Sequence, residues 1–139
     1  PGFIPRPSDQ RLMLGMYYED YLPNKENIKE HLNFMYGTGL PFGPPDQIRY
    51  SDTLRLPSYK RVDIGFSAQL FQRKQDALAP MAPHKKINSA WLSLEVFNLL
   101  GIQNTLSYTW VQDQSSGKTY AVPNRLTSRL LNLKLIVKF

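Results

Sequence analysis

Apolar and polar residues alternate along the end of the chain, over residues 129–139. The odd positions of this stretch are Leu131, Leu133, Leu135, Val137 and Phe139, and the even positions include Asn132, Lys134 and Lys138. A period of two sends successive side chains to opposite faces of a strand, whereas the apolar positions of an amphipathic helix recur every three or four residues. The pattern therefore predicts a terminal β-strand with one apolar face.

Four earlier segments alternate in the same way and are predicted to be strands. The first begins at Arg11, the second covers about Glu30 to Tyr36, the third covers Arg61 to Leu70, and the fourth begins near Trp91. A helix competes in the last of these, since W-L-S-L-E-V-F-N-L-L also places apolar residues three and four apart. We favour a strand because the neighbouring segments are strands and a sheet needs continuity. The pattern slips across Gly101, which indicates a bulge or kink, before it resumes at Leu106.

Proline, glycine and asparagine gather in the predicted connections between these strands. The connections are residues 1–10, 21–29, 37–58, 72–88, the polar tip 113–117, and 122–124, which lead into the last strand. Residues 37–58 form a long segment without predicted secondary structure, and such loops tend to be functional or disordered. Its glycines do not match a dinucleotide-binding fingerprint, because no helix follows them to hold a phosphate.

Aromatic residues fall at the ends of the predicted strands, which points to lipid beside the apolar faces. Tyr18 or Tyr21, Phe71, Trp91 and Phe139 gather at one end, and Tyr36, Tyr59, Tyr108 and Trp110 at the other. Two aromatic belts are typical of membrane barrels. From Tyr59 to Phe71 a strand rises about 40 Å, and a tilt near 45° reduces this to about 28 Å, close to the hydrocarbon thickness. Five strands would leave two bare edges in lipid, so we expect the rest of a barrel upstream of Pro1.

Composition argues against several other functions. The chain has no cysteine and two histidines, His31 and His84, so a disulfide framework, a thiolate nucleophile and a zinc site are not expected. Its net charge of +6 comes from 17 Lys and Arg spread among 11 acids without a basic helix, so nucleic acid is not an expected partner. An acid–base pair of Asp63 and Glu95 lacks a supporting catalytic motif, and we expect neither an enzyme nor a cofactor. There is no apolar run long enough for a membrane-spanning helix, and the start at Pro1 suggests a piece of a longer precursor.

Four segments resemble the TonB-dependent outer-membrane receptors. They are Y-G-T-G-L-P-F-G-P-P from Tyr36, L-P-S-Y-K-R-V-D-I-G-F-S from Leu56, L-E-V-F-N-L-L-G-I-Q-N from Leu94, and the closing P-N-R-L-T-S-R-L-L-N-L-K-L-I-V-K-F. V-F-N-L-L is similar to the recurrent penultimate-strand signature of that family. Leu133, Leu135, Val137 and the terminal Phe139 resemble its barrel-assembly signal.

The resemblance implies an all-β fold, in which residues 1–139 supply about five antiparallel, up-and-down strands at the C-terminal end of a large transmembrane β-barrel. Such a barrel has about twenty-two strands and a plugged lumen. The implied location is the outer membrane of a Gram-negative bacterium. The implied partners are outer-membrane lipid, the remaining barrel and its plug domain, TonB acting through the plug, the barrel-assembly machinery, and a nutrient of the siderophore, vitamin, saccharide or peptide class.

Two groups of candidate site residues follow from this interpretation. Arg61, Asp63, Glu95, Asn132 and Lys134 are expected to face the lumen, where they pair with one another, bind the plug or simply face water. Phe42, Arg49, Tyr50 and Arg55 lie in segment 37–58, which is expected, like 111–123, to be extracellular and to gate or contact ligand. Segments 21–29 and 72–88 are then periplasmic. The alternative is a soluble all-β module, a sandwich or barrel that binds a glycan or peptide.

Overall fold

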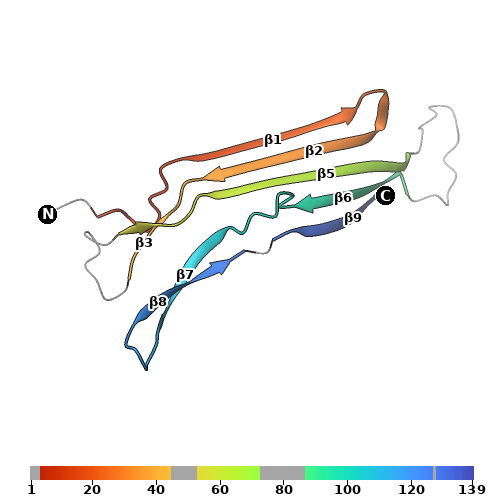
Figure 1. Ribbon diagram of the computed structural model, residues 1–139. Helices are drawn as coiled ribbons and strands as arrows, with labels where there is room; N and C mark the ends of the chain where they lie inside the picture. The colour runs from red at the N-terminus through yellow and green to blue at the C-terminus, as the bar shows by residue number, and fades with distance from the viewer. Residues whose placement is uncertain (1–3, 45–52, 73–86, 127) are drawn as a thin grey trace, which may run out of the picture.

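The computed structural model describes residues 4–44, 53–72, 87–126 and 128–139. Every helix or strand assigned in these residues is a β-strand (Figure 1). The prediction of an all-β chain with antiparallel pairing is confirmed. No helix capable of crossing a membrane occurs in the described ranges.

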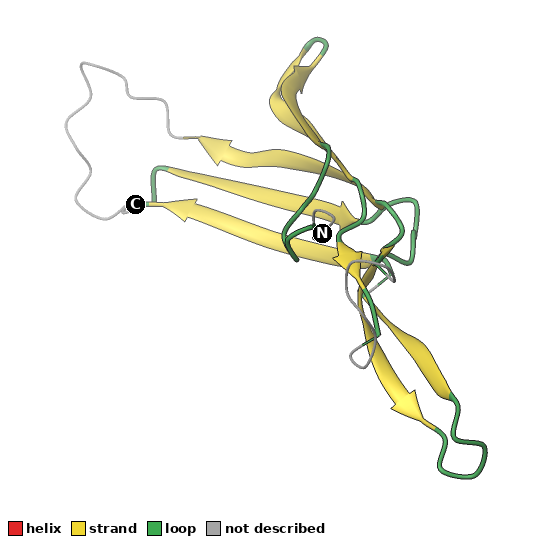
Figure 2. Ribbon diagram, turned by 90° about the vertical axis from the view of Figure 1, so that its left-hand side faces the viewer, coloured by secondary structure: helices red, strands yellow, loops and turns green. Residues whose placement is uncertain are grey.

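Five long strands form one antiparallel sheet. They are β1 (Met13–Leu22), β2 (Lys25–Gly37), β5 (Tyr59–Gln72), β6 (Ser89–Phe97) and β9 (Leu130–Lys138), and they lie in the order β1-β2-β5-β6-β9 (Figure 1). Each long strand pairs with the next one along the chain, which is an up-and-down arrangement. The sheet is an open layer with β1 and β9 at its edges (Figure 2).

A two-residue turn joins β1 to β2. Leu22 pairs with Lys25 across Pro23 and Asn24, and Asn24 has a φ of 62°. Proline followed by a residue with positive φ is typical of a type II turn. The predicted connection over residues 21–29 is therefore too long: pairing with β1 extends β2 back to Lys25, despite the turn-forming composition of this segment.

Between β6 and β9 the chain leaves the sheet and forms a separate ribbon. β7 (Thr105–Gln112) pairs antiparallel with β8 (Thr119–Arg125), and this ribbon projects from one end of the sheet (Figures 1 and 2). The kink predicted near Gly101 is a full interruption of the strand, where Asn98 and Gly101 have φ values of 52° and 65°. The prediction that residues 122–124 form a connection is wrong. Pro123 lies in β8 opposite Tyr108, because an edge strand tolerates a missing N–H group.

The two faces of the sheet differ in polarity. Directly opposed residues share a face, and the row Leu32–Ile64–Val96–Leu131 crosses four strands on one of them, the apolar face. On that face Leu133 and Leu135 are 68% and 60% exposed. The buried polar residues are Asp63, Ser93, Glu95, Asn98 and Asn104, whereas Ala90 is the one buried hydrophobic residue among those described. Burial and hydrophobicity are thus reversed relative to a domain with an apolar core.

The predicted aromatic belts are divided between the two faces. Tyr18 and Tyr36 lie on the apolar face, opposite Leu32 and Leu14. Trp91 lies opposite Ile136 and Gln69 on the other side of the sheet, in register with the charged positions. Trp91 is therefore placed to interact with polar groups of the sheet.

Candidate functional site

The second side of the sheet, called the polar face below, collects the charged residues singled out in the sequence. One row places Glu19 opposite His31, His31 opposite Gly65, Gly65 opposite Glu95, and Glu95 opposite Asn132. Residues an even number of positions away on the same strand share this face. The five residues predicted to face a lumen all lie on it: Arg61, Asp63, Glu95, Asn132 and Lys134.

Glu95 is the centre of one polar cluster. Its carboxylate accepts a hydrogen bond from Asn132 Nδ2 at 2.9 Å and one from Lys134 Nζ at 3.0 Å. His31 Nε2 lies 3.9 Å from the same oxygen that Lys134 contacts. A charge that is 8% exposed needs such partners, because burying an unpaired carboxylate is costly. Three strands, β2, β6 and β9, therefore converge on this one group.

Gly65 makes room for that convergence. A Cβ atom at Gly65 would lie 2.1 Å from His31 Cε1, 2.4 Å from His31 Nε2 and 3.0 Å from Glu95 Cγ. The His31 ring thus crosses the surface of β5 at the one position where the strand has no side chain. The ring also stacks on Tyr17, with 6.3 Å between ring centroids.

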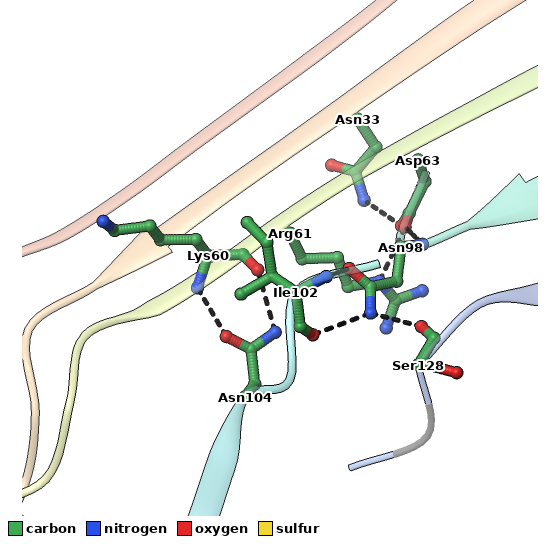
Figure 3. Close-up of polar contacts among 8 residues, drawn as sticks. All are labelled: Asn33, Lys60, Arg61, Asp63, Asn98, Ile102, Asn104 and Ser128. Carbon is green, nitrogen blue, oxygen red and sulfur yellow. Dashed lines mark hydrogen bonds and ion pairs between the residues drawn. The ribbon is translucent and has the colours of Figure 1, made fainter. Parts of the chain in front are cut away.

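Asp63 is the centre of a second cluster, nearer the β7–β8 ribbon (Figure 3). It accepts hydrogen bonds from Arg61 Nε at 2.7 Å, from Asn33 Nδ2 at 3.3 Å and from the backbone N–H of Asn98 at 2.8 Å. Asp63 is 4% exposed, so these donors replace its water shell. The carboxylate joins β2 and β5 to the point where the chain leaves β6.

Two asparagines, Asn98 and Asn104, form a clasp at the base of the ribbon (Figure 3). Asn104 Nδ2 donates to the carbonyl of Lys60 at 2.8 Å, and its Oδ1 accepts from the N–H of Lys60 at 2.9 Å. This side chain takes the place that a neighbouring strand would fill beyond the end of β6. Asn98 Nδ2 donates to the carbonyls of Ile102 and Ser128. The clasp satisfies backbone groups that would otherwise lack partners.

The sequence interpretation did not identify Asn98 and Asn104 as important residues. The available signal was the pair of asparagines on either side of Gly101, at the point where the alternation slips. Asparagine tolerates positive φ and carries both a donor and an acceptor, which suits it to an interrupted strand.

The candidate residues of segment 37–58 have different partners in the structure. Phe42 lies in β3 (Pro41–Phe42), which pairs with β4 (Leu54–Arg55) inside the predicted loop. Its ring stacks on Tyr108 of the ribbon at 4.7 Å between centroids and lies 6.4 Å from Trp110. Arg55 instead binds the N-terminal segment, with Nη2 2.5 Å from Asp9 Oδ2. Arg49 and Tyr50, the other two candidates, lie outside the described residues.

The residues resembling an assembly signal lie on β9 and just beyond it. Leu133, Leu135 and Val137 pair with Leu94, Leu92 and Ala90 of β6, which places them on the apolar face. Phe139 is 79% exposed.

No group of three or more His, Asp or Glu side chains suited to a metal ion occurs in the described part of the chain. The site consists of a polar face with two hydrogen-bonded carboxylate clusters and an asparagine clasp. Searches against models of protein families, curated proteins and solved structures find no match to this chain.

Proposed function

We propose that this chain is the C-terminal part of the barrel wall of a TonB-dependent outer-membrane receptor. The intact receptor binds a nutrient of the siderophore, vitamin, saccharide or peptide class and imports it with energy transduced by TonB. One observation carries the proposal: the sheet exposes a continuous apolar face and buries polar residues on the opposite side.

The medium beside the apolar face determines the free-energy cost of its exposed side chains. Leaving a Leu or Phe side chain in water forgoes about 1.5–3 kcal/mol relative to burial. The exposed side chains of the apolar face include Leu131, Leu133, Leu135 and Phe66. Lipid removes this penalty without a second protein layer, and alternation of lipid-facing and lumen-facing residues is the pattern of membrane barrels. The edge strands β1 and β9 would then pair with further strands of the same barrel.

The polar face supports the same proposal from the other side. Its carboxylates are paired, as at Glu95 with Lys134 and at Asp63 with Arg61. A lumen wall needs such polarity because it faces water or a plug domain. Phe42 and Arg55 belong to an extracellular hairpin in this proposal, and deleting residues 37–58 from the folded receptor is expected to weaken ligand binding.

The chain has no cysteine, so single cysteine substitutions give a clean test of the two faces. Leu133→Cys and Lys134→Cys are neighbours on β9 that point to opposite faces. Each is introduced into the intact protein, which is placed in lipid vesicles and labelled with a nitroxide. Collision with oxygen, which is enriched in lipid, and with a water-soluble nickel complex then reports the surroundings of each label.

We expect the label at position 133 to collide with oxygen and that at position 134 to collide with the nickel complex. A soluble binding module predicts a different pattern: either both labels meet the nickel complex, or position 133 is shielded from both reagents by protein. Either result would reject the barrel proposal.

A further inference from the structure

The ammonium group of Lys29 lies inside a small cage on the polar face. Its Nζ is 4.8 Å from the ring centroid of Tyr21 and 5.7 Å from that of Trp91. Glu19 Oε1 accepts a hydrogen bond from it at 3.2 Å. Two aromatic rings and a carboxylate thus surround one cation.

The strand register explains how these groups meet. Tyr21 and Lys29 are directly opposed on β1 and β2, and Lys29 is opposed on its other side by Ser67 of β5. Serine is small, so the indole of Trp91 reaches from β6 across β5 toward Lys29. The Tyr17 hydroxyl donates to Glu19 Oε2 at 2.7 Å and holds the carboxylate in place.

The cage opens into a hollow on the polar face. This cavity has a volume of ≈ 490 Å³, and its walls include Glu19, Lys29, Trp91 and Glu95. Cavities of roughly 300–1,000 Å³ hold small organic ligands. The side chain of Lys29 is 32% exposed, so it has a path out of the cage to water.

We propose that Glu19, Tyr21 and Trp91 form a binding site for an organic ammonium group, which Lys29 occupies as an internal substitute. Aromatic faces attract cations, and quaternary ammonium ligands are recognised by rings arranged in this way. A bound ligand displaces Lys29 into the cavity. This inference uses residues of the polar face alone and does not depend on the medium beside the apolar face.

Lys29 competes with any external cation because it is tethered beside the cage. Its removal is therefore expected to raise the affinity for a small ammonium ion. The test uses the intact protein and choline as the probe, with binding followed by saturation-transfer NMR on the ligand. The uncharged carbon analogue of choline has the same shape and serves as the matched control.

We expect Lys29→Ala to bind choline at least about tenfold more tightly than the unaltered protein, with no such gain for the uncharged analogue. In the Lys29→Ala background, Trp91→Leu or Glu19→Gln should remove most of that gain. Equal affinity of Lys29→Ala and unaltered protein for choline would overturn the proposal, as would a Trp91→Leu variant that still binds.

Circular dichroism checks that each variant is folded. Lys29→Met keeps the length of the side chain without its charge, and it replaces Lys29→Ala if that variant does not fold. In this second variant the cage holds a neutral group that is easier to displace. Choline affinity no higher than in the unaltered protein would again reject the site.

Discussion

A methyl group at Gly65 is expected to force the His31 ring out of its position between β1 and β6. The Cβ of Gly65→Ala would lie 2.1 Å from His31 Cε1, far inside van der Waals contact. The imidazole is the end of a side chain, so it can rotate away. That movement separates it from Tyr17, on which it stacks, and from the carboxylate of Glu95.

The change in the free energy of unfolding caused by Gly65→Ala is the sum of stabilising and destabilising contributions. Replacing a strand glycine by alanine stabilises by about 0.4–1 kcal/mol, because the unfolded chain loses freedom. Overpacking costs about 1–3 kcal/mol, and a lost ring stack adds about 0.5–1.5 kcal/mol. We therefore expect Gly65→Ala to lower the free energy of unfolding by about 2 kcal/mol, measured by urea titration of the intact protein.

Gly15 supplies a matched control on β1. It also lies in the long sheet, and a Cβ atom there would meet nothing within 4 Å. Gly15→Ala should be neutral or slightly stabilising. Combining Gly65→Ala with His31→Ala removes the ring that collides and should make the added methyl group nearly neutral in the His31→Ala background. If Gly65→Ala is as stable as Gly15→Ala, or if removing the ring does not relieve the cost, the steric reasoning is wrong.

Three further predictions concern the ribbon. Asn104→Leu leaves the N–H and C=O of Lys60 unpaired and should destabilise the protein by about 1–3 kcal/mol in the same titration. Hydrogen bonds from Ser116, the larger cause, and from Ser115 lower the pKa of Asp113 from its ordinary 3.8 to about 2. The tip should therefore keep these hydrogen bonds above about pH 4 and lose them as the pH falls through about 2, which NMR amide shifts would detect. Phe42→Ala removes the stack on Tyr108 and should speed amide hydrogen exchange in β7 and β8.

Each of these predictions has a control. Asn124→Leu alters an exposed asparagine of the ribbon and should change stability by less than about 0.5 kcal/mol. Asp113→Asn should abolish the acid transition at the tip, and a transition that persists in this variant would assign it to another group. Phe42→Tyr keeps the ring and should leave hydrogen exchange unchanged.

The alternation of apolar and polar residues was sufficient to predict β1, β2, β5 and β9, because that signal is local, whereas at β6 it also fitted a helix and the neighbouring strands decided. It predicted which side of β9 holds Leu133 and which holds Lys134. It did not predict Pro123 within a strand, since pairing with Tyr108 outweighs the turn-forming composition there.

Other features depend on contacts between residues distant in the chain. Asn104 and Lys60 are 44 residues apart, and only the register of β5 beside the ribbon brings them together. The same holds for Gly65 and His31, whose contact follows from the pairing of β2 with β5. Such partners cannot be found from spacing along one strand.

The two hydrogen bonds between the Asn104 side chain and the Lys60 backbone separate the ribbon from the pairing of the long strands. Since one amide side chain ends the hydrogen-bond ladder at Lys60, the pairing of the long strands does not rely on β7 or β8 beyond that point. We therefore expect that residues inserted at the tip, or a ribbon of another length in its place, would not shift the strands beneath it. A sheet of this kind can carry ribbons of different length and surface while its own strand pairing stays constant.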